Sequence, residues 1–242
     1  GSDARTRQAV KSPHGTRHIS SADIAEYDTE NGGPTSDAVH MDCNFLAMSG
    51  GLNPVVHLHS QRKGRLIWDE RTSCYRPENK SDEWTSIGSA NGTFQLGRAL
   101  SEATRVASSV ITTLAKENKR IILQELVSTP KTDENKQNWA PLPVWLVQSG
   151  QPYISDKTAF VDFQNDATAA DIKLAVREGY HSIEHVKRYT TTGMATDQGK
   201  TSNINAIGIL ANTLRKSITE TGTTTFRPPY TPTSLGAIAG RN

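Results

Sequence analysis

The stretch that decides how this chain folds and what it binds is Arg188-Tyr-Thr-Thr-Thr-Gly-Met-Ala-Thr-Asp-Gln-Gly-Lys-Thr-Ser-Asn203. It holds five threonines, two glycines, one arginine and one lysine, and it leads into a helical pattern. Glycines let the backbone approach a ligand closely, while hydroxyls and the free amides at a helix start donate hydrogen bonds. These groups and the two cations indicate a site for a phosphate or another polar anion. The same groups commonly cap helices and form surface ion pairs, so this second role stays open.

Three short helices are expected around this stretch. The first begins at Thr168, which can form a capping box with Asp171, and it ends at Gly179. The second follows a cap at Ser182, and the third covers the regularly spaced apolar residues of 204–214. Together they predict a compact helical module.

The sequence up to about residue 80 has the character of β-strands. A hairpin is expected between the turns at His14-Gly15 and Asn31-Gly-Gly-Pro34. Residues 43–48 form a nearly apolar run that ends at Ser49-Gly50-Gly51, which predicts a buried strand and a tight turn where open α/β sheets bind ligands. Two further short strands are expected at residues 65–70 and 74–76.

A turn at Ile87-Gly88-Ser-Ala-Asn-Gly-Thr93 precedes the longest helical pattern in the chain, which runs from Phe94 to Leu114. Small residues on its apolar stripe suit close packing against a sheet. A strand, a glycine-bearing turn and a helix in this order present bare amide groups to an anion. Such turns are more often simple connections, so the turn alone does not establish a ligand site.

Changes in composition divide the chain into four parts. Residues 126–156 are polar, carry four prolines and lack sustained periodicity, which predicts a linker. The predicted division is residues 1–125, the linker 126–156, the helical module 157–222 and a stiff extended segment 223–242.

Composition and charge exclude several classes of function. A chain of 242 residues holds one large domain or two small ones, and its net charge of +2 gives no field that favours nucleic acid or a membrane surface. No apolar run approaches membrane-spanning length, and the two cysteines lack the spacing of a metal site, which predicts a reduced, cytoplasmic protein. The pairs His57/His59 and His181/His185 lack further ligands at suitable spacing, so no metal site is predicted.

A set of long motifs carries a resemblance to a known family. They are Phe160-Val-Asp-Phe-Gln-Asn-Asp166, Glu184-His-Val-Lys-Arg-Tyr-Thr-Thr191, Thr196-Asp-Gln-Gly-Lys200 and residues 223–232, preceded by Met48-Ser-Gly-Gly51 and Asn91-Gly92. These motifs closely resemble the α subunit of heterotetrameric sarcosine oxidase. The resemblance extends from about Cys43 to the C-terminus.

The resemblance implies an α+β fold. A partial dinucleotide-binding α/β region, Rossmann-like and glutathione-reductase-like, would precede the small helical module. The family's GxGxxG fingerprint does not occur in this sequence, and the family's folate-binding domain would begin where the sequence ends. We therefore expect a middle piece of the subunit.

The family's activity implies partners and cofactors for this chain. Sarcosine is oxidised to glycine at an FAD on a different subunit, electrons pass to an FMN between two subunits, and oxygen becomes hydrogen peroxide. The one-carbon product is captured as methylenetetrahydrofolate. The resemblance thus implies an oxidoreductase complex of one-carbon metabolism in the cytoplasm, with a flavoprotein β subunit and smaller subunits as partners. This chain would provide one wall of the FMN site and no catalytic residue.

The helical module also resembles the [2Fe-2S] modules of related amine and opine dehydrogenases, but without cysteines. The places that correspond to cluster ligands hold Val161, Asp162, Phe163, Asp197 and Ser202. Because a cluster needs thiolates, the resemblance implies a module that has lost its cluster and now binds flavin.

The expected cofactor contacts follow from side-chain chemistry and the resemblance together. For FMN the candidates are cations, hydroxyls, an amide and a glycine: Arg188, Thr191, Thr196, Gln198, Gly199, Lys200, Thr225 and Arg227. For NAD in the complete subunit they are Gly50, Gly51, Asn91 and Gly92. Two alternatives stay open: a non-catalytic assembly module, and the equivalent subunit of N-methylglutamate dehydrogenase.

Overall fold

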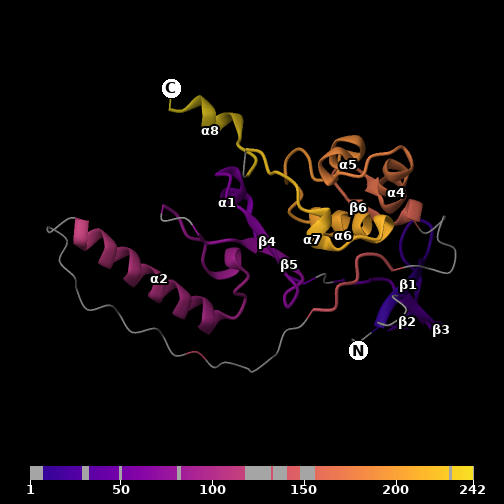
Figure 1. Cartoon of the computed structure of the whole chain (residues 1–242). Coiled ribbons are helices and arrows are strands. Elements are labelled where there is room, and N and C mark those ends of the chain that lie inside the picture. Colours follow the sequence, from indigo (N-terminus) through magenta and orange to yellow (C-terminus); the bar gives the residue numbers. More distant parts are fainter. Residues whose placement is uncertain are drawn as a thin grey trace. The chain divides into compact units, whose positions relative to one another are not determined.

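The computed structural model describes residues 8–28, 33–48, 51–80, 83–117, 132, 141–147, 156–228 and 231–241. These residues form a mixed α+β structure, as the sequence predicts (Figure 1). The chain divides into two compact units, one of Gly1–Gly50 with Pro143–Thr224 and one of Gly51–Leu142 with Thr225–Asn242. The domain boundaries expected from the sequence stay a prediction, and most of the expected linker lies outside the described residues.

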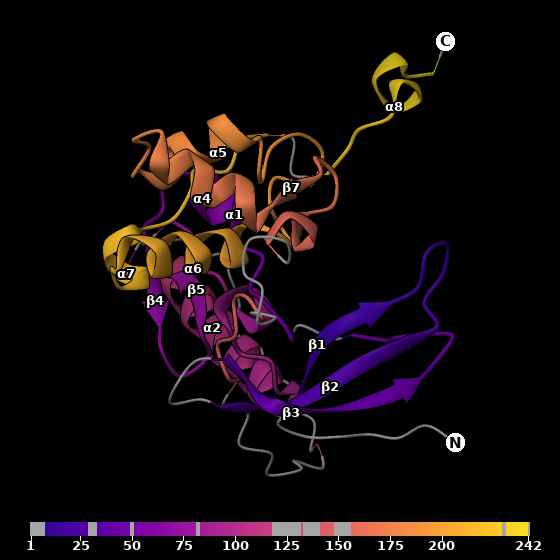
Figure 2. The ribbon, with the colours of Figure 1, turned by 90° about the vertical axis from the view of Figure 1, so that its right-hand side faces the viewer.

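The first unit contains a three-stranded antiparallel sheet in the order β1-β2-β3 (Figure 2). The strands are β1 (Gln8–His14), β2 (Ser21–Asp28) and β3 (Gly33–Asp42). The expected hairpin is therefore confirmed. Its first turn requires glycine, because a Cβ on Gly15 (φ 137°) would lie 2.0 Å from the carbonyl oxygen of His18. A β-bulge between Val10 and Ser12 shifts the register of β1 against β2.

The prediction of a buried strand at residues 43–48 is wrong. These residues form no strand, and the side chains of Phe45 and Met48 are each 77% exposed. Cys43 still donates a backbone hydrogen bond to the carbonyl of Ser20, so the ladder closes there. An apolar run becomes a strand only where a neighbouring strand pairs with it, and none of the described strands does so beyond this point.

The first unit also contains the expected helical module (Figure 1). A short hairpin of β6 (Phe160–Asp162) and β7 (Ala167–Thr168) leads into α4 (Ala169–Arg177). The remaining helices are α5 (Ile183–Thr190), α6 (Asn203–Leu214) and α7 (Ile218–Thr221). Helix α4 packs against both α5 and α6, and α7 packs against α6. Fully buried side chains of α4, α5 and α6, among them Ile172, Val186, Ile207 and Leu210, form the core.

Local signals set the ends of α4 as predicted. Thr168 and Asp171 form a capping box, in which the Thr168 amide donates to Asp171 Oδ2 at 2.8 Å. Gly179 follows the helix with φ 90°. Ser182 does occupy the position before α5, but its side chain makes no capping hydrogen bond, so that part of the prediction is wrong.

A close contact fixes the outer side of α6. A Cβ on Gly208 would lie 2.2 Å from Cγ of Trp145. The glycine therefore leaves the space that the indole ring fills against the helix.

The second unit holds short strands and a long helix. Strands β4 (Leu66–Asp69) and β5 (Cys74–Pro77) pair antiparallel, as expected for these segments. They lie in the chain between α1 (His57–Gln61) and the 3-10 helix η1 (Gly88–Asn91), and the expected long helix is α2 (Leu96–Glu117). The apolar residues Leu96, Val110 and Leu114 of α2 are 68%, 49% and 46% exposed.

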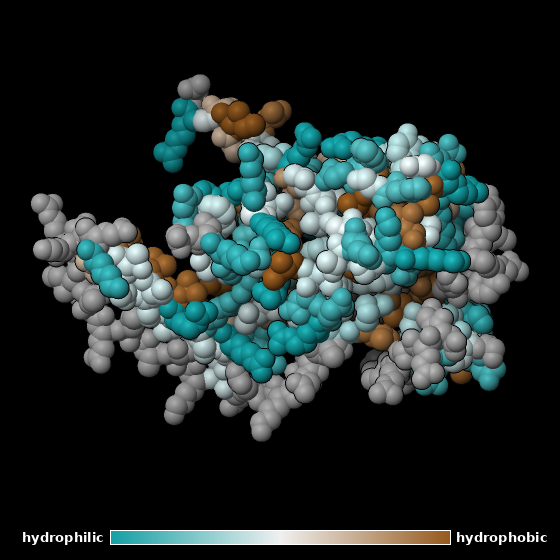
Figure 3. Space-filling model, viewed as in Figure 1, coloured by the Kyte–Doolittle hydropathy of each residue, from teal (hydrophilic) through white to brown (hydrophobic). Residues whose placement is uncertain are grey.

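The final segment is not extended throughout, which corrects the prediction for residues 223–242. Helix α8 (Leu235–Ala239) begins at Ser234, whose side chain accepts a hydrogen bond from the Ala237 amide. Its apolar residues Leu235 and Ile238 are 83% and 70% exposed. Figure 3 shows hydrophobic surface, in brown, at the C-terminal segment. Throughout the described ranges, every helix is too short or too polar to traverse a lipid bilayer.

Candidate functional site

The loop between α5 and α6 folds tightly back on itself. Five residues in it have positive φ angles: Thr191, Gly193, Ala195, Gln198 and Gly199. A non-glycine residue in this region costs free energy, so the surrounding structure must hold the loop in place.

The amide side chain of Asn203 occupies the space beside both glycines of the loop. A Cβ on Gly193 would lie 2.2 Å from Asn203 Oδ1, and one on Gly199 would lie 2.3 Å from Asn203 Cγ. Asn203 is buried and donates from Nδ2 to Thr224 Oγ1 at 2.8 Å. The glycines therefore make room for the Asn203 side chain of α6, which connects the loop to Thr224.

The buried carboxylate of Asp162 holds the loop from the other side. Its Oδ2 accepts from the Gly193 amide at 2.7 Å and from Ser202 Oγ at 3.2 Å. Its Oδ1 accepts from the amides of Gln164 and Asn165 at 2.9 and 3.2 Å. Burial opposes ionisation, but the backbone hydrogen bonds outweigh it and lower the pKa of Asp162 below its ordinary value. An ionised carboxylate thus joins the β6–β7 hairpin to the loop.

Two of the positions that the resemblance equates with cluster ligands meet at this point. Asp162 and Ser202 are 2% and 0% exposed and are joined by their hydrogen bond. Asp197 bonds elsewhere, because its carboxylate accepts from the Gly199 amide at 2.8 Å and from Thr201 Oγ1 at 3.2 Å. Hydrogen bonds to the carboxylates of Asp162 and Asp197 therefore hold this part of the loop.

The predicted FMN ligands of the first unit all lie on α5 or in the loop that follows it, but they differ in how far they are exposed to solvent. Arg188 is exposed and forms an ion pair with Glu184 at 3.3 Å. Thr191 is exposed, and Thr196 is exposed with its hydroxyl donating to Gln164 Oε1 at 2.6 Å. The remaining three are buried or half-buried: Gln198, Gly199 and Lys200.

The loop therefore has an inner and an outer side. The inner side consists of amides already bonded to Asp162 and Asp197. The outer side presents hydroxyls and a guanidinium group, which can bind a polar or anionic group that approaches from solvent or from another chain.

The two remaining FMN candidates belong to the second unit. Thr225 and Arg227 are exposed, while Phe226 between them is buried, with its ring centroid 4.0 Å from that of His57. Phe226 therefore anchors this segment beside α1, and its two neighbours point outward.

Of the predicted NAD residues, Asn91 belongs to a hydrogen-bond network with Glu102 of α2. Gly51 is exposed with φ 86°, whereas Gly50 lies outside the described residues. Asn91 donates from Nδ2 to Glu102 Oε1 at 2.7 Å, and the Gly88 amide donates to Glu102 Oε2 at 2.9 Å. Gly92 ends η1 in the left-handed conformation. An amide of the turn that could have faced an anion thus binds a carboxylate of the chain itself.

Sequence reasoning missed the supporting roles of three residues: Asp162, Asn203 and Glu102. A local signal existed for Asp162, since an aspartate before a turn commonly accepts hydrogen bonds from the amides that follow it. Its contact with Gly193 spans 31 positions in the sequence and has no local signal. The hydrogen bond between Asn203 and Thr224 spans 21 positions and likewise has no local signal in the sequence.

Comparisons with known proteins agree with the motifs in the sequence. Residues 156–241 match the family model of the sarcosine oxidase A3 domain. The sarcosine oxidase subunit alpha of Rhizobium meliloti (strain 1021) is 40% identical over 217 residues, which cover 90% of this chain and 21% of that protein. The corresponding subunit of Corynebacterium sp. (strain P-1) is 40% identical over 203 residues, covering 83% and 20%.

A solved structure shares the fold at low identity. The L-proline dehydrogenase from P. horikoshii superposes with a TM-score of 0.60 and 16% identity, covering 95% of this chain and 44% of that one. This likeness concerns the fold alone, whereas the family model assigns residues 156–241 to a sarcosine oxidase A3 domain. Over most of its length the chain belongs to the sarcosine oxidase α subunits, and the resemblance found in the sequence is confirmed. The chain spans about a fifth of the length of these relatives.

Proposed function

We propose that this chain is part of the α subunit of a multi-subunit sarcosine oxidase. The complex would convert sarcosine to glycine with oxygen, giving hydrogen peroxide and, with tetrahydrofolate, methylenetetrahydrofolate. FAD would lie on a partner flavoprotein subunit, and NAD would bind the complete subunit beside Gly51, Asn91 and Gly92. The chain itself would supply one wall of an FMN site at a subunit interface.

The observation that carries this proposal is the two-sided loop between α5 and α6. Asp162 and Asn203 fix its backbone from within, while Arg188, Thr191 and Thr196 lie exposed on its outer side. A site of this kind is preorganised, because the loop pays little further conformational entropy when a ligand binds. The donor set fits FMN, whose phosphate accepts charge-assisted hydrogen bonds and whose ribityl chain and ring edge are polar.

The chain's own residues have distinct tasks in this proposal. Arg188, Lys200 and Arg227 would bind the phosphate or the polar edge of the flavin, at about 1.5–3 kcal/mol for each charge-assisted bond. Thr191, Thr196, Gln198 and Thr225 would donate or accept hydrogen bonds at the ribityl chain and ring. FMN, when bound, would supply the capacity to accept electrons.

The cofactor content of the native complex tests the proposal. The protein is purified with its associated subunits, the non-covalent flavin is released, and FAD and FMN are quantified by chromatography with covalent flavin measured separately. Equal amounts of FAD and FMN, together with sarcosine-dependent formation of hydrogen peroxide, are expected. FAD without FMN would contradict the proposed site.

Single substitutions test the assigned residues. Arg227→Ala is expected to lower the FMN content of the complex and leave its FAD content unchanged. Arg105→Ala is the matched control, because Arg105 is an exposed arginine of the same unit on α2. If Arg227→Ala retains the FMN occupancy of the control, Arg227 does not belong to the site.

One observation favours a second candidate, a non-catalytic assembly module. Both turns that were expected to bind an anion bind carboxylates of the chain, Asp162 with Asp197 in one and Glu102 in the other. A complex that contains FAD alone and retains its subunit composition would support this candidate. Oxidation of N-methylglutamate in preference to sarcosine would instead identify the subunit of N-methylglutamate dehydrogenase.

A further inference from the structure

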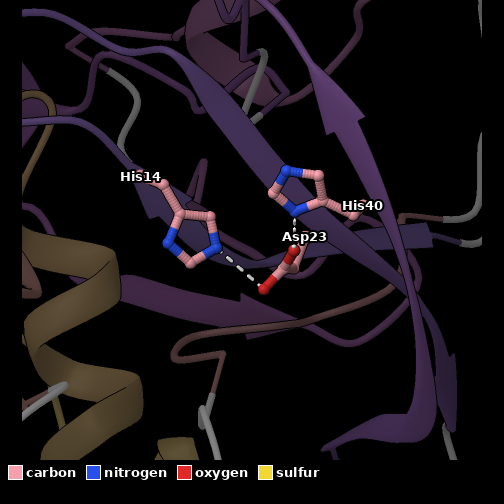
Figure 4. A group of neighbouring side chains, drawn as sticks. All are labelled: His14, Asp23 and His40. Carbon is pink, nitrogen blue, oxygen red and sulfur yellow. Dashed lines mark hydrogen bonds and ion pairs between the residues drawn. The ribbon is translucent and has the colours of Figure 1, made fainter.

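Two histidines and an aspartate meet on one face of the β1-β2-β3 sheet, in a part of the first unit that the proposed flavin site does not use. His14 Nε2 lies 2.8 Å from Asp23 Oδ2, and His40 Nδ1 lies 2.7 Å from Asp23 Oδ1 (Figure 4). Each residue offers one ligand atom, and the three atoms lie within 4.8 Å of one another. The two rings flank the carboxylate, with their centroids 5.6 Å apart.

The register of the sheet brings these residues together. Asp23 on the central strand is directly opposite His40 on β3, which puts both side chains on the same face. His14 is opposite Ser21, two residues from Asp23, and therefore shares this face as a diagonal neighbour. One residue from each strand contributes to the cluster.

The β-bulge in β1 is required for this arrangement. The register passes from Val10 opposite Ile24 to Ser12 opposite Asp23, so that two steps along β1 match one step along β2. In an unbroken ladder from Val10 opposite Ile24, His14 would fall on the other face, because side chains alternate with a period of two. Bulges commonly redirect a side chain in this way near functional sites.

A second carboxylate lies behind His40. Asp42 Oδ1 is 3.7 Å from His40 Nε2, on the side of the ring opposite to Asp23. This distance is too long for a hydrogen bond, and the Asp42 side chain is 96% exposed. A carboxylate that moved to accept from Nε2 would leave the lone pair of Nδ1 for a metal ion, as in carboxylate–histidine–metal triads. Asp42 is thus a candidate outer partner beside the three direct donors.

We propose that His14, Asp23 and His40 bind a divalent transition metal ion of the zinc type. Two imidazoles and one carboxylate are a common protein ligand set for Zn²⁺, with water in the remaining position. A tetrahedral ion with bonds of about 2.0–2.1 Å needs donor atoms roughly 3.3 Å apart. The two N–O contacts of 2.7 and 2.8 Å would therefore lengthen, and the two histidine nitrogens, which lie within 4.8 Å of each other, would come closer through rotation of these side chains. Hard cations such as Mg²⁺ prefer oxygen ligands and are expected to bind poorly here.

Zinc binding to the 242-residue chain tests this proposal. After equilibrium dialysis against ZnCl₂, elemental analysis of the wild type should give one more equivalent of zinc than His14→Ala or His40→Ala. His18→Ala is the matched control, since His18 is an exposed histidine of the turn between β1 and β2, and it should retain the wild-type content. Asp42→Ala is expected to weaken zinc binding by about 10-fold, the lower end of the usual range for outer partners.

A second measurement keeps the proposal testable if a variant unfolds. In the wild type, ZnCl₂ should shift the NMR signals of the His14 and His40 rings before those of the other histidines, and MgCl₂ should shift neither. Three results would overturn the proposal. The zinc content could be equal in all variants, zinc could be lost only in His18→Ala, or ZnCl₂ could leave the NMR signals of the His14 and His40 rings unshifted. The FMN content of the complex does not enter this test, so the two proposals fail independently.

Discussion

Replacing Asp162 with asparagine should loosen the loop between α5 and α6 while the rest of the module stays folded. The carboxylate accepts four hydrogen bonds, two at each oxygen, and its side chain is 2% exposed. Asparagine replaces one acceptor oxygen with an NH₂ group. If Oδ2 is lost, the buried amide of Gly193 faces another donor; if Oδ1 is lost, the part-buried amides of Gln164 and Asn165 do.

The size of the effect follows from these contacts. A buried donor that loses its acceptor costs about 1–3 kcal/mol, and the bonds that remain lose the strengthening that a charged acceptor provides. We therefore expect a loss of about 2–3 kcal/mol in the free energy that closes the loop, which corresponds to a roughly 30- to 150-fold larger equilibrium constant for opening.

Hydrogen exchange measured by mass spectrometry gives the direct assay, because amides of residues 191–203 exchange when the loop opens. Asp162→Asn should accelerate their exchange by the factor above. Asp166→Asn is the matched control: Asp166 is exposed in the same hairpin and has φ 51°, which asparagine tolerates well. The reasoning would be refuted if the loop amides of Asp162→Asn exchanged within about twofold of their rate in the control Asp166→Asn.

The pH dependence of the same loop follows from the direction of the Asp162 pKa shift. Because the folded-state pKa lies below the ordinary value of 3.8, the ionised carboxylate stabilises the folded loop above that pH. This contribution disappears as the pH falls through the lowered pKa. Exchange of the loop should therefore depend on pH below about 4 more strongly in the wild type than in Asp162→Asn, after correction for intrinsic rates.

Two further predictions concern packing and thiol chemistry. Gly208→Ala should destabilise the module by about 1–3 kcal/mol in thermal unfolding, because the added Cβ would overlap Trp145. Gly236→Ala is the control and should have little effect, because the atom nearest to its added Cβ is 4.0 Å away. Equal melting temperatures of the two variants would contradict the Trp145 contact. Burial raises the pKa of the Cys74 thiol to about 11, which keeps it protonated and unreactive at pH 8. Iodoacetamide should therefore modify the half-buried Cys43 well before Cys74, as measured by peptide mass spectrometry. Faster labelling of Cys74 would show that its surroundings are more open than described.

Local signals in the sequence predicted the helices well. The Thr168–Asp171 capping box and the apolar spacing of 204–214 involve residues within one or two turns of each other, so sequence alone contains the information. The hairpin of β1 and β2 was predicted for the same reason. The run at residues 43–48 failed because a strand depends on a partner that local composition does not specify.

The candidate site was predicted in its composition but not in its support. The sequence identified the loop of Arg188 to Asn203 and its exposed hydroxyls. It did not reveal that Asp162 and Asn203 bind the loop from within, because these contacts join residues that are distant in the chain or depend on the loop's unusual backbone angles. The histidine cluster was missed because a one-residue bulge decides which face His14 occupies.

A structure of the chain in complex with its companion subunits tests the central claim most directly. The account predicts an FMN molecule at a subunit boundary, with its phosphate or polar ring edge within hydrogen-bond distance of the outer side of the 191–202 loop. A loop that faces only water there, with flavin bound elsewhere, would contradict it.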